Sequence, residues 1–371
     1  MKKRTVAFLV CAAMIGSLLA GCGNGEKGNT SDSTVENVSG TSEQGEKDDS
    51  TASGESKGTI GWIMINLTNS FYVSAVEAAQ KAADELGYEL IVRDCGGSLE
   101  TEIDMIENFI EMDVDVICAD FVNAEGLADA CKKADDAGIK MISLFNSIDT
   151  GYNYSVAYDH YTGFKAATIA ACEALEGEGQ VVYMHGGIGN WAGDERTRGF
   201  EDAVADYPGI EVLSTQSCNW DPATGVSIAQ TWLTQYDHID AMFCMTDGVT
   251  PSLIELIADA GRTDEILLVG NDGETPVLEQ MNTEGCNVGA DALLSSLRGG
   301  YLAVLCADQL IQGNEIEKTT WIPVSLVVSD KVMEVLENSD ADLSFIDVLT
   351  AEEGLEVANN YQNEFKDYFS E

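Results

Sequence analysis

The chain has 371 residues, of which 45% are hydrophobic and 8% aromatic, so it holds enough apolar material for more than one domain core. Asp and Glu number 64 against 19 Lys and Arg, which gives a formal net charge of −45. A surface this acidic repels nucleic acid and anionic lipid, which argues against nucleic acid as a partner and against membrane attachment through a basic patch.

The first 21 residues have the pattern of a cleaved export signal. Basic residues from Lys2 to Arg4 precede an apolar run from Val6 to Leu19, and small residues follow. The run Leu19-Ala20-Gly21-Cys22 resembles the lipobox of bacterial lipoproteins, a family in which the signal is cut before the cysteine and the cysteine is acylated. The resemblance implies a signal peptide over residues 1–21 and an extracytoplasmic protein anchored to the cell membrane by a lipidated Cys22. An ordinary export signal with an incidental cysteine is the alternative.

Residues 22–58 are predicted to form a flexible, lipid-anchored linker. After Cys22 this stretch consists mainly of Gly, Ser, Thr, Asn, Glu, Asp and Lys, and Val35 and Val38 are nearly its only apolar residues. Such a composition buries too little surface to offset the entropy cost of ordering the chain.

From residue 59 onward, short apolar runs rich in Ile and Val alternate with segments of helical period. The first series predicts strands at 59–65, 89–93, 114–119 and 140–144, with helices at 70–86, 99–112 and 124–137. The second predicts strands at 180–184, 211–215, 241–245 and 265–270, with helices at 194–205, 223–236, 251–260 and 275–281. Strands joined by one helix each are parallel, because a crossover helix is the short way back. The predicted fold class is therefore α/β, with two doubly wound parallel-sheet lobes.

The side chains that follow these strands indicate what the sheets bind, because such sheets bind ligands beyond the carboxyl ends of their strands. They are Asn66, Asn69, Asp94, Asp120, Phe145 and Asn146 in the first series, and Asn190, Trp191, Trp220, Asp247, Asn271 and Asp272 in the second. Amides and carboxylates bond neighbouring hydroxyls, and aromatic rings pack on the C–H faces of a sugar. The pattern favours a polyhydroxylated ligand.

Few of these residues offer a nucleophile beside a base, so an enzyme is not expected. The eight cysteines after residue 58 have no CxxC pair, and His160, His185 and His238 have no ligand spacing, so no metal is expected. The segment Gly187–Ala192 imitates a dinucleotide fingerprint, but export argues against a nicotinamide partner. No cofactor is expected.

Four segments resemble the type I periplasmic sugar-binding proteins of ABC importers, a family that includes ribose- and galactose-binding proteins. They are 69–72, 194–200, 243–247 and 269–273, within a similarity that runs from about 59 to 328. The resemblance implies a hinged, monomeric solute-binding lipoprotein, of the periplasmic binding protein type I fold, that traps a monosaccharide or similar polyol between two lobes and delivers it to an ABC permease. A sugar-sensing module for a histidine kinase or chemoreceptor is the alternative.

The resemblance also assigns binding roles and lobes. Asn69 and Arg196 are expected to bond sugar oxygens, Asp272 to accept from two hydroxyls, and Phe71, Tyr72 and Trp220 to form facing aromatic walls. The full set of expected ligand-binding residues is Asn69, Phe71, Tyr72, Phe145, Asn146, Asn190, Trp191, Arg196, Trp220, Asp247 and Asp272. The expected first lobe is 59–158 plus 293–324, and the second is 159–292 plus 325–371.

The sequence departs from the family at three points. Ribose binders have Asp-Arg at the end of the fourth strand, where this chain has Leu144-Phe145-Asn146; the register places Phe145 on the Asp, and a one-residue slip would place Asn146 there, as in a galactose-type site. Thr246 stands where Asn is frequent, and Leu293 where Gln is frequent. These departures remove the evidence for ribose itself. The stretch 329–371 exceeds the family's usual end and is expected to form a helical cap on one lobe.

Overall fold

A computed structural model describes residues 56–187 and 189–370 of the chain. The predicted signal peptide, Cys22 and nearly all of the predicted linker lie outside the described residues. No helix within the described ranges has the length and apolar character needed to span a bilayer.

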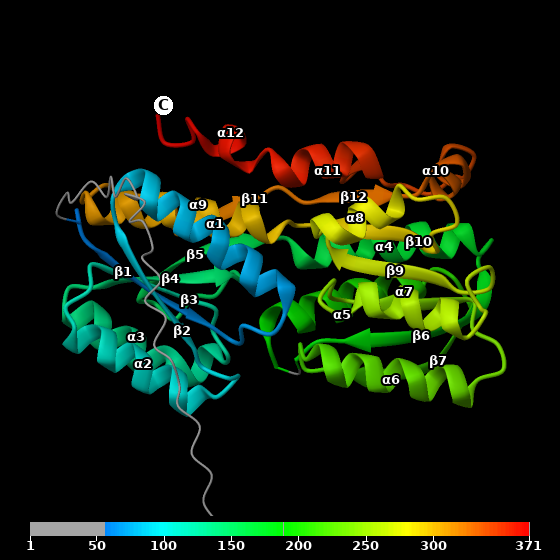
Figure 1. Cartoon of the computed structure of the whole chain (residues 1–371), viewed down its shortest axis with the longest axis horizontal. Coiled ribbons are helices and arrows are strands. Elements are labelled where there is room, and N and C mark those ends of the chain that lie inside the picture. The colour runs from blue at the N-terminus through cyan, green and yellow to red at the C-terminus, as the bar shows by residue number, and fades with distance from the viewer. Residues whose placement is uncertain (1–55, 188, 371) are drawn as a thin grey trace, which may run out of the picture. The chain divides into compact units, whose positions relative to one another are not determined.

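Strands and helices alternate along most of the described chain (Figure 1). The first part contains β1 (Thr59–Met64), α1 (Ser70–Leu86), β2 (Glu89–Asp94), α2 (Leu99–Glu111), β3 (Val116–Ala119), α3 (Ala124–Asp136), β4 (Lys140–Phe145) and β5 (Asn153–Tyr158). The second contains α4 (His160–Ala174), β6 (Glu178–His185), α5 (Trp191–Val204), β7 (Gly209–Ser217), α6 (Pro222–Gln235), β8 (Ala241–Cys244), α7 (Thr250–Asp259), β9 (Leu267–Asp272), α8 (Thr275–Met281) and β10 (Val288–Leu293). The third contains α9 (Ser296–Ile311), β11 (Thr319–Ile322), β12 (Ser325–Val328), α10 (Asp330–Glu337), β13 (Asp347–Thr350), α11 (Ala351–Asn359) and α12 (Tyr361–Phe365).

The described strands form a six-stranded sheet of order β11-β5-β4-β3-β1-β2 and a seven-stranded sheet of order β13-β12-β10-β9-β8-β6-β7. All neighbours in these two sheets are parallel except β10 and β12, which are antiparallel. The predicted α/β class with two parallel sheets is confirmed. Periodicity did not reveal β5 or the strands from β10 onward, most of which have only four residues.

Helices cover both faces of each sheet, which makes two layered lobes. In the first lobe α1 and α9 pack on one face of the six-stranded sheet, and α2 and α3 pack on the other (Figure 1). In the second lobe α4, α5 and α10 pack on one face of the seven-stranded sheet, and α6, α7, α8 and α11 pack on the other. The chain passes between the lobes after β5, after β10 and between β11 and β12.

The C-terminal segment contacts both lobes. Strand β13 pairs with β12 at the edge of the second sheet, and α11 packs against α8. Helix α12 instead packs against α9 of the first lobe, where Glu364 accepts a hydrogen bond of 2.8 Å from Nε of the buried Arg298. The sequence expectation placed 325–371 wholly with the second lobe, whereas α12 makes its contacts with the first.

Helices α1 and α9 approach so closely that their contact requires glycine. A Cβ added to Gly300 of α9 would lie 2.0 Å from the backbone oxygen of Ala75 in α1. Buried alanines on α1, including Ala78, Ala79 and Ala82, make the same approach possible.

We therefore expect Gly300→Ala to lower the free energy of unfolding by about 1–3 kcal/mol, because the backbones must separate to admit the methyl group. Gly163→Ala in α4 is the matched control, because its Cβ would meet only the Cβ of Ala292 at 3.4 Å. That control should be neutral or stabilise the protein by up to about 1 kcal/mol through helix propensity. Urea denaturation measures both, and equal effects of the two substitutions would contradict the packing argument.

Candidate functional site

The carboxyl ends of strands from both sheets converge on one cavity. The cavity is lined by Asn69, Phe71, Tyr72, Asp120, Phe145, Asn146, His160, Ala192, Arg196, Trp220, Thr246 and Asp272. The first six come from the first lobe and the others from the second.

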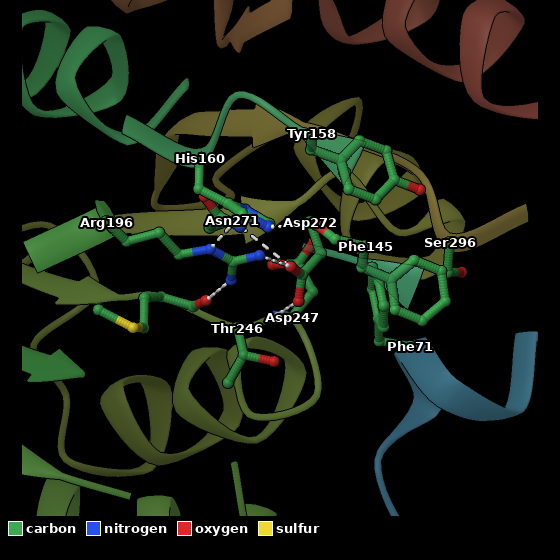
Figure 2. Close-up of polar contacts among 12 residues, drawn as sticks. Phe71, Phe145, Tyr158, His160, Arg196, Thr246, Asp247, Asn271, Asp272 and Ser296 are labelled. Atoms are coloured by element: carbon green, nitrogen blue, oxygen red, sulfur yellow. Dashed lines mark hydrogen bonds and ion pairs between the residues drawn. The ribbon is translucent and has the colours of Figure 1, made fainter. Parts of the chain in front are cut away.

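An ion pair between Arg196 and Asp272 forms one wall of the cavity (Figure 2). Arg196 lies in α5 and is 3% exposed, and its Nη2 lies 3.1 Å from Oδ1 of Asp272 at the end of β9. Asp272 also accepts from the backbone N–H of Asp247 at 3.0 Å and from the side chain of Asn271 at 2.9 Å. Burial raises the pKa of Asp272, and the charge of Arg196 opposes that rise. The carboxylate is therefore held by fixed donors.

His160 connects Arg196 to the first lobe. Its Nε2 lies 3.0 Å from the backbone oxygen of Phe145, and its Nδ1 lies 3.2 Å from Nε of Arg196 (Figure 2). Because Arg196 can only donate, Nδ1 accepts and Nε2 carries the proton, which makes the ring neutral. Burial, and then the charge of Arg196, hold the pKa of His160 well below its usual range. The neutral ring of His160 therefore orients Arg196 without adding a second positive charge beside it.

Aromatic rings line the cavity on the sides of both lobes. The ring of Phe71 meets that of Phe145 edge-on at 5.0 Å, and the Phe145 ring lies parallel to that of Tyr158 at 6.2 Å. In the second lobe the guanidinium of Arg196 lies 5.4 Å from the centre of the Trp220 ring. Phe145 and Trp220 both have left-handed backbones, with φ of 64° and 59°. Such strain in bulky residues is concentrated at functional sites.

Two polar groups of the first lobe complete the cavity. Asn69 caps α1 through Oδ1, which accepts from Phe71 N at 3.0 Å, while its Nδ2 donates to Thr246 Oγ1 of the second lobe at 3.3 Å. Asp120 accepts from Asn146 Nδ2 at 2.7 Å. Burial raises the pKa of Asp120 to about 7, against the hydrogen bonds from Tyr72 and Asn146. Asn69 thus both caps α1 and lines the cavity.

The structure brings eight of the eleven expected binding residues to the cavity: Asn69, Phe71, Tyr72, Phe145, Asn146, Arg196, Trp220 and Asp272. Phe145 and Asn146 both line it, so either register of the family comparison places a cavity residue at this position. The other three lie elsewhere. Asn190 caps α5, the Trp191 ring lies 5.6 Å from that of His160, and Asp247 is buried behind Asp272.

Four residues outside the expected set also line the cavity. Asp120 and Thr246 each follow directly after a predicted strand. Their place at a strand end is the sequence signal that could have added them to the expected binding residues. His160 and Ala192 carry no such signal, because His160 begins a helix after an unpredicted strand and Ala192 has no functional group. Within the described ranges, no three His, Cys, Asp or Glu side chains form a group suited to a metal ion.

Comparison with known proteins agrees with this architecture. Residues 60–315 match the family model of the periplasmic binding protein domain. The chain is 29% identical over 279 residues to the ribose import binding protein of Escherichia coli K12. The aligned region covers 75% of this chain and 93% of that protein. The predicted resemblance to sugar-binding proteins of ABC importers is confirmed.

Solved structures of ABC transporter solute-binding proteins share the fold. The protein of Bacillus halodurans C-125 with bound myo-inositol has a TM-score of 0.69 at 24% identity, over 77% of this chain and all of that one. The protein of Actinobacillus succinogenes 130z with bound D-allose has a TM-score of 0.67 at 23% identity, over 75% of this chain and all of that one.

The raised pKa of Asp120 predicts a pH-dependent cost. In the unfolded chain this carboxyl ionises near pH 4, whereas in the folded protein it ionises near 7, so its contribution to stability is lost as pH rises between these values. We expect Asp120→Asn to raise the free energy of unfolding at pH 8 by on the order of 2 kcal/mol and to change it little at pH 4.

Chemical denaturation at the two pH values measures this difference. The control is Asp136→Asn, an exposed partner of Lys132 in α3, which should change stability by less than about 1 kcal/mol at either pH. An Asp120→Asn effect of the same size at both pH values would contradict the assigned pKa.

Proposed function

Because this chain belongs to the family of periplasmic binding protein domains, we propose that it captures a monosaccharide or similar polyol between its lobes and delivers it to an ABC importer. The observation that carries the proposal is the buried Arg196–Asp272 pair beside aromatic rings in a cavity lined by both lobes. One relative described above is named for ribose import, and the two solved structures hold D-allose and myo-inositol; all three compounds are neutral and polyhydroxylated. These names support a ligand class and leave the individual sugar open.

The groups in the cavity suit hydroxyls. A guanidinium carries five N–H groups, and the partners of Arg196 within the described residues are His160, the Met245 carbonyl and Asp272, so donors remain for ligand oxygens. Asp272 can accept from adjacent hydroxyls, since a carboxylate has about four acceptor sites. The rings of Phe71 and Trp220 can pack on the C–H faces of a sugar.

Hinge closure is the proposed mechanism of capture. Asn69 of the first lobe already bonds Thr246 of the second, so the cavity is completed only when the lobes meet. A sugar that contacts both lobes makes its full set of bonds in that arrangement alone, and so it shifts the population towards the closed form. The closed form is what a permease would recognise.

A thermal-shift screen tests the proposed function. We expect at least one of D-ribose, D-galactose, D-allose, L-arabinose, myo-inositol or xylitol to raise the melting temperature by roughly 5–10 °C at a hundredfold excess over its dissociation constant. Amino acids are the control class and should leave the melting temperature unchanged. Indifference to every sugar and polyol would overturn the proposal.

Variants then assign the binding to this cavity. With whichever compound of the screen binds, calorimetry should show that Arg196→Met and Asp272→Asn each lose about 2–4 kcal/mol of binding free energy, because each removes charge-assisted hydrogen bonds in a buried site. Arg198→Met is the matched control, since Arg198 lies on the same helix but is half-exposed and paired with Glu195. Full affinity in both cavity variants would place the sugar elsewhere.

Membrane attachment through Cys22 is part of the proposal and is supported by the lipobox pattern of residues 19–22. In a bacterial host that makes lipoproteins, we expect Cys22→Ala to abolish incorporation of labelled palmitate and to move the protein from the membrane fraction to the soluble or secreted fraction. Cys95→Ala, which alters a buried cysteine of the folded body, is the control and should keep the label. A Cys22→Ala protein that retains the lipid would contradict the anchor.

A further inference from the structure

A second hollow adjoins the cavity, and we name it the mouth groove. It has a volume of about 250 Å³ and is lined by Ile65, Asn66, Thr68, Gly96, Gly97, Val122, Gly187, Asn190, Asn219, Trp220 and Asp221. Trp220 lines both the cavity and the groove, so the two spaces share a wall.

The topology places the groove away from the crossings between the lobes. Its residues follow β1, β2 and β3 in the first sheet and β6 and β7 in the second. Strands β2 and β7 are the edge strands opposite β11 and β13, which lie near the crossings. The mouth groove is therefore at the open side of the space between the sheets, where a substituent on the sugar would emerge.

One residue that lines the groove has a buried polar atom without a partner within the described residues. Trp220 is 7% exposed, and its indole Nε1–H donates to no acceptor there. Asn190 also lines the groove; its Oδ1 accepts from Gly193 N at 3.3 Å, which leaves its Nδ2 to donate to other partners. Unmade hydrogen bonds of buried groups are costly, so such donors are expected to be satisfied by a ligand or by water.

Two further amides add to this set of donors. Oδ1 of Asn66 accepts from Thr68 N at 3.1 Å and from Asn69 N at 3.0 Å, so its Nδ2 can donate to other partners. The side chain of Asn219 makes no hydrogen bond within the described part of the chain. The groove lining contains no Lys or Arg and contains the carboxylate of Asp221, so it suits a neutral group and repels an anionic one such as a phosphate.

The wall of the groove is held rigidly. Asn219 and Trp220 are consecutive residues with left-handed backbones, at φ of 50° and 59°. Asn adopts this conformation readily, whereas for a bulky residue such as Trp220 it costs about 1–3 kcal/mol. The Trp220 ring packs on Gly187, where an added Cβ would lie 2.9 Å from Nε1. Asn219 N donates to Ser217 Oγ at 3.2 Å, which fixes the loop. A strained loop that presents one ring to two spaces is preorganised for binding in both.

We propose that the mouth groove is a second subsite, which takes a neutral, hydroxylated substituent attached to the sugar in the cavity. The chemical class of ligand is therefore a glycoside in which the second unit is a sugar or a polyol, bonded by the amides of Asn66, Asn190 and Asn219. This inference rests on the proposed function, because the first unit must occupy the cavity.

Calorimetry with matched pairs of ligands tests the subsite. Each pair consists of a parent and a derivative: D-ribose with methyl β-D-ribofuranoside, D-galactose with melibiose, and myo-inositol with galactinol. Melibiose and galactinol are the two-unit compounds, because each carries a second sugar or polyol unit. We expect at least one two-unit compound to bind within about threefold of its parent or more tightly. Asn219→Gly keeps the backbone angle, removes the amide, and should weaken that compound at least fivefold while changing its parent by less than twofold.

Glu176→Gly is the control variant, because Glu176 is another exposed residue with a left-handed backbone, at φ of 57°, and lies outside both spaces. It should change neither affinity. If the parents bind and every two-unit compound is rejected, or if Asn219→Gly weakens parent and two-unit compound alike, the subsite is overturned and the proposed function stands. If no parent and no two-unit compound binds, the subsite falls together with the proposed function.

Discussion

The buried ion pair between Arg196 and Asp272 is the interaction on which the candidate site depends. A buried carboxylate or guanidinium is tolerated only when its charge is paired and its remaining hydrogen bonds are made. Here the partners come from the neighbouring strand ends and from the start of α4, through the Met245 carbonyl, the backbone of Asp247 and the ring of His160. The two lobes are linked to this pair because His160 also bonds the carbonyl of Phe145 in the first lobe.

The pair lies among further buried acids, and their arrangement explains why Asp247 faces away from the cavity. Asp247 Oδ2 accepts from Glu274 N at 3.0 Å, and Asp291 Oδ1 accepts from Gly273 N at 2.9 Å. The other oxygen of each carboxyl points at Gly270, where an added Cβ would lie 2.8 Å and 2.3 Å from them. Burial, together with repulsion between the two carboxyls, raises the pKa of Asp247 well above its ordinary value. Asp247 therefore supports the turn that carries Asp272.

The sequence allowed prediction of the parts that depend on local pattern or on position along a strand. Strands buried on both faces produce apolar runs that are readable without context, and the residue after each such strand is known once the strand is known. Asp272 was found in this way and through the family resemblance, whereas Arg196 was found through the resemblance alone. His160 was not, because its role depends on a carbonyl fifteen positions earlier and on a guanidinium of another helix, which meet only in the folded chain. The short strands from β11 onward were missed because four residues carry too little periodicity.

The C-terminal segment constrains any hinge motion that the site requires. Its strand β13 is paired within the second sheet, while Tyr361 and Phe365 of α12 are buried against α9 of the first lobe. The segment therefore adds a fourth connection to the three at which the chain passes between the lobes. Opening must either preserve the contacts of α12 through rotation about the short link after α11, or break the ion pair between the buried Arg298 and Glu364. Because breaking the pair would leave the buried charge of Arg298 without its carboxylate, rotation about that link is the motion consistent with a reversible cycle of capture and release.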